Sequence, residues 1–205
     1  PMLAPHLATT VIEILLGLLI GGLLGSIAAL TMILSPLLKR WLLPVLVISQ
    51  AIPVFALAPI LLLWLGYGMA SKVAMAVLII FSPVTASLYD GMRRTDHDLL
   101  DLARIMGASP AGVLRHIVLP SALPAFAAGL RVAAAVAPIG AVIGEWVGSS
   151  EGLGFYMLHA NARMQVDLMF AALTLLAAAS LTLYFCIDRL LDRLVYWQPK
   201  HGTAP

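Results

Sequence analysis

The sequence predicts an all-α protein that crosses a membrane several times. The chain has 205 residues, of which 61% are hydrophobic and only 11% are charged, whereas a soluble domain typically has about 25% charged and about 45–50% apolar residues. The apolar residues gather in five long stretches, each long enough for a spanning helix, which needs about 20 of them. The short alternating segments typical of a transmembrane barrel do not occur. The net charge of +2 is too small to indicate nucleic-acid binding.

The five stretches differ in their helix-breaking and small residues. The second contains three prolines, Pro44, Pro53 and Pro59, so we expect a broken helix whose freed backbone groups need partners or water. The first contains two overlapping G-x-x-x-G patterns, which favour close packing within one subunit over a dimer seam. The fourth carries a similar small-residue face, Gly140, Gly144 and Gly148. The expected spans are 6–34, 41–66, 70–92, 120–147 and 168–196.

Basic residues predict how the chain lies in the membrane. With five spans, most of them fall on one side, which is therefore expected to be cytoplasmic together with the C-terminus. The other side has only Lys72 and Arg163. Pro1 is then expected on the outside. Because the chain begins with Pro rather than Met, we expect it to start inside a longer protein, with one more span upstream. The residues of the basic side are Lys39, Arg40, Arg93, Arg94, Arg104, Arg115, Arg189, Arg193 and Lys200.

A polar stretch, DLARIMGASPAGVLRHIVLP (101–120), separates the third span from the fourth. Thr95 and Asp98 resemble a capping box, and Gly107 suits a left-handed helix end. Ser109 and Pro110 then favour the start of a second helix. We expect two short helices, the first at about 96–106, hinged at Gly107 and too short to span. The apolar face of the first, with Leu99, Leu102, Ala103 and Met106, must pack against span ends or another protein.

This stretch resembles the cytoplasmic signature of ABC-importer permeases. That signature reads Glu-Ala-Ala, three residues, Gly, nine residues, Ile, one residue, Leu-Pro. The residues at the matching positions are Asp101, Leu102, Ala103, Gly107, Ile117, Leu119 and Pro120. Asp101 keeps the charge of the family's Glu, whereas Leu102 adds bulk. Stretches 49–68 and 137–173 are similar to the nitrate/sulfonate/taurine group of these permeases, and within it to permeases for pyrimidine precursors of thiamine.

The resemblance implies a type I importer permease fold, a single permease domain over 1–205 and a coupling segment at 95–120. It implies a bacterial inner-membrane subunit that works with a second copy of itself, ABC ATPase subunits and an extracytoplasmic binding protein, surrounded by lipid. ATP and Mg²⁺ would bind the ATPase, and the chain itself has no G-x-x-x-x-G-K-[ST] phosphate loop. No cofactor, metal or catalytic residue is expected here.

The expected substrate is a small polar solute, with a hydroxymethylpyrimidine or related aminopyrimidine favoured. Nitrate, a sulfonate or taurine is the alternative. Two other classes of function remain open: an intramembrane enzyme, and a membrane anchor without transport. An enzyme would need a reactive constellation at one depth, and no helix carries a metal-like His/Glu pair.

Four charged residues within the spans need partners or water, because a charge inside the membrane is costly. They are Glu13, Arg131, Glu145 and Asp188. Arg131 and Asp188 fall roughly 16 Å and roughly 10 Å from the cytoplasmic ends of their spans at 1.5 Å per residue. We therefore expect a structural ion pair, with snorkelling of either side chain as the alternative. Glu13 is expected to be shallow and reached by water.

Three residues are candidates for the substrate route: Gln50, Glu145 and Trp146. Gln50 precedes the predicted break in the second span, where its amide could also satisfy the kinked backbone. Glu145 could accept a hydrogen bond from an aminopyrimidine, or could contact the loop 149–167. Trp146 could line the route, or could anchor the span in the aromatic belt at the membrane interface.

Overall fold

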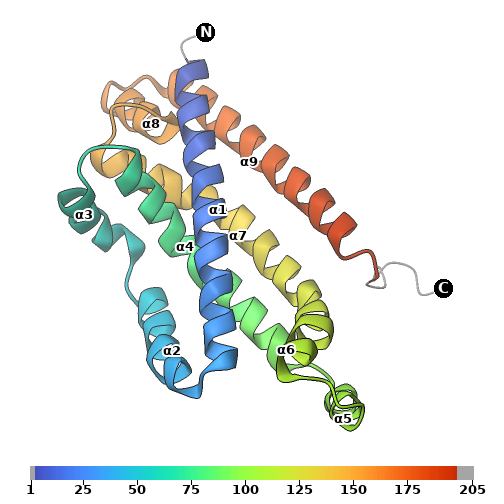
Figure 1. Ribbon diagram of the computed structural model, residues 1–205. Coiled ribbons are helices and arrows are strands. Elements are labelled where there is room, and N and C mark those ends of the chain that lie inside the picture. The colour runs from blue at the N-terminus through green and yellow to red at the C-terminus, as the bar shows by residue number, and fades with distance from the viewer. Residues whose placement is uncertain (1–2, 198–205) are drawn as a thin grey trace.

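The structure, a computed structural model, describes residues 3–197, and within that range every regular element is a helix (Figure 1). This confirms the all-α prediction. Four helices are long: α1 (Leu3–Leu34), α4 (Met69–Arg93), α7 (Leu119–Gly148) and α9 (Val166–Leu194). The shorter ones are α2 (Pro36–Ala51), α3 (Val54–Leu65), α5 (His97–Ile105), α6 (Pro110–Val113), the π-helical turn η1 (Leu114–Val118) and α8 (Leu153–Ala162).

Glycine contacts give the relative directions of the long helices. Gly17 of α1 faces Ala76 of α4, and Gly25 faces Thr85, so α1 and α4 are parallel. Gly91 of α4 faces Ala122 of α7, and Gly144 of α7 faces Lys72 of α4, so these two helices are antiparallel. The G-x-x-x-G face of α1 thus packs within the chain, as the sequence predicts.

Because α1 and α4 run in the same direction, the chain between them must return to the end where α1 began. The pair α2 and α3 makes this return with a bend of 107°. Counted as one broken span, it brings the segments of the described chain that are long and apolar enough to cross a membrane to five. The break falls at Ile52 and Pro53, whereas Pro44 and Pro59 lie inside their helices.

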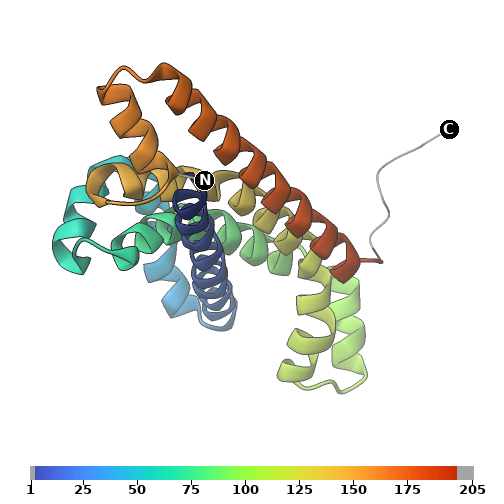
Figure 2. The ribbon, with the colours of Figure 1, turned by 90° about the horizontal axis from the view of Figure 1, so that it is seen from above.

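The core of the bundle lies where α4 packs between α1 and α7. Its most enclosed side chains include Ile14 of α1, Ile80 and Val84 of α4, and Ala137 of α7. Small residues at the contacts allow the three backbones to approach closely, which is how helices associate in a membrane. Seen from above, α9 lies along the outer side of α7 (Figure 2), and only Ala172 and Leu191 of it are buried.

The coupling segment begins as predicted, but with a different cap. Asp96 is the N-cap of α5 and accepts the Asp98 N–H, whereas the Thr95 hydroxyl donates to the Met92 carbonyl. Gly107 has φ +76°, and the Ala108 N–H donates to the Ala103 carbonyl at 3.0 Å. The helix therefore ends in the left-handed glycine turn that the sequence indicated.

The second short helix is not a separate element, which corrects the prediction of two short helices. It continues through η1 into α7, giving one helical run from Pro110 to Gly148, 39 residues long. Pro120 has no N–H to donate to the preceding turn and crowds its carbonyl. The wider π-helical turn immediately before it, Leu114–Val118, accommodates the proline without ending the helix.

Replacing Gly140 with Ala should destabilise the protein by about 1–3 kcal/mol, because the added methyl overpacks a filled contact. Its Cβ would lie 2.7 Å from the Cα of Ala76, a backbone atom that cannot rotate away. Gly22→Ala is the matched control, since its Cβ would lie 3.8 Å from Cδ2 of Leu130, an ordinary contact distance. Denaturant unfolding of the purified variants measures both effects, and equal stability of the two would contradict the close α4–α7 contact.

Candidate functional site

The amphipathic helix α5 protrudes from the bundle at the end opposite α8 (Figure 1). On α5, Ala103 is buried, but the larger side chains of the predicted apolar face are not. Leu102 is 53% exposed and Met106 is 77% exposed. Ile105, which the sequence analysis did not single out, is 84% exposed. Since the span ends do not cover this face, it is available to another protein.

The seven signature residues divide between this tip and its base. Asp101 forms an exposed ion pair with Arg104 at 2.8 Å, and Gly107 makes the turn behind the helix. Ile117, Leu119 and Pro120 are half-buried, and Leu119 packs against the cluster that contains Met92 of α4. Asp101 and Leu102 of the signature therefore face outward. Leu119, near its end, joins α7 to α4.

A buried ion pair lies near the other end of the bundle. Lys72 Nζ of α4 is 3.1 Å from Glu13 Oε1 of α1, and the two side chains are 8% and 0% exposed. Neither Glu13 oxygen has a hydrogen-bond partner of good geometry within residues 3–197, and the Glu145 carboxyl is close enough to interact with it. The prediction that water reaches Glu13 is wrong. Lys72 is buried in this pair and is not a charge exposed in a loop. The outer side therefore has fewer exposed basic residues than the sequence suggested.

Glu145 fastens α8 to the bundle. Its Oε2 accepts the Gly154 N–H at 2.5 Å, and its Oε1 accepts the Thr10 hydroxyl at 2.6 Å. The Leu153 N–H donates to Thr10 Oγ1 at 2.9 Å, and the Gly152 N–H donates to His6 Nδ1 at 3.1 Å. Three successive N–H groups at the start of α8 are thus capped by side chains of α1 and α7. A carboxylate is favoured there because a helix N-terminus carries partial positive charge.

The structure therefore buries Glu145 against the start of α8. Its side chain is 1% exposed and is bonded to the segment 149–167, the alternative considered from the sequence. The partner is a backbone N–H rather than Arg163, which is exposed. Gly152 and Gly154 leave the room that this contact needs, since a Cβ on either would collide with the Glu145 carboxyl.

Arg131 joins α7 to α9. Its Nε lies 2.5 Å from Asp188 Oδ1, and its second contact is to Asp192 Oδ1 at 2.6 Å. The pair with Asp188 was expected from depth, whereas Asp192 was not considered. The sequence did hold a signal for it, because residues four apart share one face of a helix.

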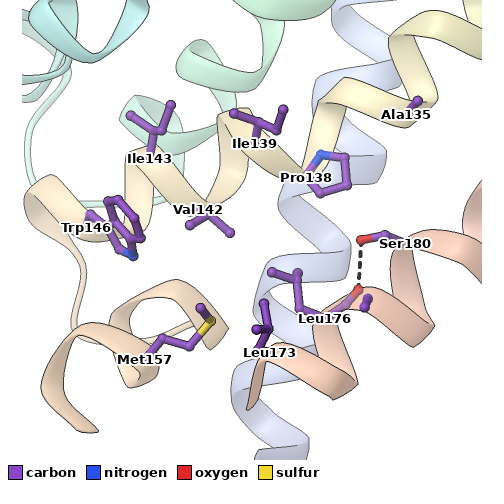
Figure 3. Close-up of a pocket in the computed structure, with 11 residues that line it drawn as sticks. Ala135, Pro138, Ile139, Val142, Ile143, Trp146, Met157, Leu173, Leu176 and Ser180 are labelled. Atoms are coloured by element: carbon purple, nitrogen blue, oxygen red, sulfur yellow. Dashed lines mark hydrogen bonds between the residues drawn. The ribbon is translucent and has the colours of Figure 1, made fainter. Parts of the chain in front are cut away.

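Gln50 and Trp146 have separate surroundings. Gln50 is exposed and lines a hollow of about 360 Å³ between α2, α4 and α7. Trp146 lies with Met157 and Leu173 around an apolar hollow of about 520 Å³ between α7, α8 and α9 (Figure 3). The one hydroxyl there, of Ser180, donates to the Leu176 carbonyl at 2.7 Å. The three route candidates are thus not brought together, and Ser82 beside Gln50 was missed.

The described residues contain no group of three or more His, Cys, Asp or Glu that could hold a metal ion. The charged side chains inside the bundle are instead paired with one another or with helix ends. Their geometry supports holding the helices together.

Replacing Lys72 with Met should cost about 3–5 kcal/mol of stability, because it leaves the Glu13 carboxylate buried without a cation. The Glu13→Gln/Lys72→Met double variant removes both charges and should recover most of that loss. Thermal unfolding of the purified protein compares the two, with Arg163→Met as an exposed control. A single Lys72→Met variant as stable as the parent would show that the pair does not hold α1 to α4.

Comparison with known proteins agrees with this architecture. Residues 21–196 match the family of binding-protein-dependent transport system inner membrane components. A solved structure of the MetNI methionine ABC transporter in an inward-facing conformation has the same fold, with a TM-score of 0.73, 22% identity and 94% of each chain covered.

Three relatives bear on the subfamily. A probable ABC transporter permease of Haemophilus influenzae is 62% identical over 95% of this chain and 80% of its own length. The formylaminopyrimidine transport permease ThiX of Halalkalibacterium halodurans is 38% identical, with 95% and 78% covered. The taurine transport permease TauC of Escherichia coli is 31% identical, with 97% and 71% covered.

The nearly full-length family match and these relatives agree with the resemblance found in the coupling segment and with the helical architecture. The relatives are transport subunits rather than enzymes. The chain therefore belongs to the binding-protein-dependent transport system inner membrane components, as a permease subunit of an ABC importer with relatives in the nitrate/sulfonate/taurine and thiamine-precursor group.

Proposed function

We propose that this permease works as a homodimer with two ATPase subunits and an extracytoplasmic binding protein, and that α5 is the helix that docks on the ATPase. One observation carries the proposal. Leu102, Ile105 and Met106 form an exposed apolar face on a protruding nine-residue helix. An exposed apolar patch rimmed by polar residues is typical of a protein interaction site.

The connections of α5 give it a mechanical role. It lies between the C-terminal end of α4 and the α6–η1–α7 run, and α4 and α7 pack against each other from Gly91–Ala122 to Lys72–Gly144. A displacement of α5 therefore acts on both helices together. ATP and Mg²⁺ bind the ATPase subunit in this scheme, and the solute passes between the two permease copies without a covalent step.

The orientation follows from the basic residues at the α5 end. Because α1, α4 and α9 run in the same direction, Arg40, Arg93, Arg104 and Arg193 belong to the same end of the bundle. The positive-inside rule then favours a cytoplasmic coupling segment and C-terminal end. Lys200 falls outside the described residues.

The favoured substrate is an aminopyrimidine related to thiamine precursors. The formylaminopyrimidine permease is more similar to this chain than the taurine permease, at 38% against 31% identity. Taurine or another sulfonate is the second candidate.

Ile105→Ser should abolish or strongly weaken co-purification of the ATPase while leaving the permease folded, because the side chain is 84% exposed. Met164→Ser is the matched control: it removes an 81% exposed apolar side chain near the opposite end. Affinity purification of the tagged permease with quantification of bound ATPase gives the result. Undiminished ATPase binding to the Ile105 variant would refute docking through α5.

The substrate assignment is tested on the binding protein that delivers to this permease. Mass spectrometry of the ligand retained after purification should identify an aminopyrimidine. Retention of taurine or an alkanesulfonate would establish the alternative substrate, without affecting the ATPase result.

A further inference from the structure

We propose that the hollow beside the break between α2 and α3 is a binding site on the transport route for an uncharged solute that both donates and accepts hydrogen bonds. Its polar groups are the Gln50 carboxamide and the hydroxyls of Ser49 and Ser82. The inference deepens the proposed function and rests on it, because it assumes that this chain is the transport subunit.

The hollow is formed where the helices come together at mid-membrane depth. Ser82 and Pro83 lie near the middle of α4, and Val132 and Val136 lie near the middle of α7. The broken pair α2–α3 closes the third side with Gln50 and Val54. A volume of about 360 Å³ falls within the range of small-molecule sites, about 300–1,000 Å³.

Polar groups in this hollow are available for a ligand. Ser49 donates to the Leu46 carbonyl of its own helix at 2.8 Å, and its oxygen can still accept. Within residues 3–197, neither the Gln50 amide nor the Ser82 hydroxyl makes a hydrogen bond that would occupy it. Because Pro53 has no N–H, it cannot donate to the carbonyl of Ser49, four residues earlier.

Exposure of Gln50 indicates what this face of the chain meets. An amide left without a partner in hydrocarbon costs several kcal/mol, and irregular backbone at membrane depth is tolerated only where it is buried in protein or lines a water-filled cavity. Gln50 and the adjacent break, Ile52–Pro53, are both exposed in the isolated chain. This face therefore borders water or the second permease copy rather than lipid.

The uncharged lining of the hollow favours an uncharged solute. Among the residues that the structure describes, no Lys, Arg, His, Asp or Glu lines the hollow. The nearby membrane charges are engaged elsewhere, Lys72 with Glu13 and Arg131 with Asp188 and Asp192. The C-terminal end of α2 and the N-terminal end of α3 meet at the break, so their opposite partial charges give an anion no net attraction.

The walls of the hollow complete the description of the ligand. Leu78, Ile79, Val136 and Ile139 supply apolar surface on α4 and α7. A flat ring could lie on these side chains and present its polar edge to Gln50 and Ser82. A small heterocycle with amino and ring-nitrogen groups fits this lining, whereas a sulfonate would give up its hydration without gaining a cation.

The test uses thiol labelling of the assembled transporter in membranes. Cys186, the single and exposed cysteine, is first replaced by Ser. Cysteines are then introduced as Gln50→Cys and Ser82→Cys, with Met164→Cys as a water-exposed reference and Leu181→Cys, 58% exposed midway along α9, as a lipid-facing control. Each is treated with neutral methyl methanethiosulfonate and with its anionic sulfonatoethyl analogue.

Both hollow positions should react with the neutral reagent much faster than the α9 position does. At the two hollow positions, the ratio of the sulfonate rate to the neutral rate should be about tenfold lower than at Met164→Cys. The reason is that an anion without a partner is disfavoured in a site of low polarity. Adding Gln50→Arg to the Ser82→Cys variant should restore part of the sulfonate rate.

Two results would overturn the inference. If either hollow position is as unreactive as the α9 control, the hollow is not a shared site on an aqueous route. If the sulfonate reagent reacts there as fast as the neutral one, the site accepts anions. Co-purified ATPase in the same preparation checks the proposed function separately, so the two failures are distinguishable.

Discussion

The close approach of α4 to α1 on one side and α7 on the other is the constraint on which the rest of the structure depends. It is possible because Gly17 and Gly21 of α1, and Gly140 and Gly144 of α7, present no side chain to α4. In a membrane the hydrophobic effect does not drive helices together, so contact area gained by close packing is the main source of cohesion. The bend at Pro53 and the outlying position of α9 are arrangements around that three-helix centre.

The two ends of the bundle are held in different ways. Near α8, Glu13, Lys72, Thr10 and Glu145 form a buried network that ties α1, α4, α7 and α8 together. At the α5 end, an apolar cluster with Met32, Leu88 and Met92 packs the helices together, and the charged contacts are an exposed ion pair on α5 and the half-exposed group of Arg131, Asp188 and Asp192. Exposed pairs contribute little, whereas breaking a buried pair is costly. We therefore expect motion to be easier at the α5 end.

Most features that depend on neighbouring residues could be predicted from the sequence, whereas most contacts between distant helices could not, with the Arg131–Asp188 pair as the exception. The spans, the break in the second span and the left-handed Gly107 follow from local composition and turn chemistry. Glu13 was misjudged because its partner, Lys72, lies on another helix and had been counted as a loop charge. Glu145 illustrates the same limit, since its partners are Thr10 and the Gly154 N–H. The second short helix was expected to be separate from the fourth span, whereas the π-helical turn before Pro120 joins the two.

The position of the hollow relative to these two ends bears on how transport could be coupled. Ser82 and Val136 lie between the fixed network and the α5 tip on the same two helices that α5 connects. If α4 and α7 turn as a unit about the network, the displacement at Ser82 is smaller than at α5, yet it still changes the distance to Gln50. Gln50 belongs to the α2–α3 pair, which also packs on α4 through Leu46 and on the end of α7 through Leu62. Because α5 is joined in the chain to α4 and α7 but not to the α2–α3 pair, a displacement of α5 would change the shape of a hollow that lies between these elements.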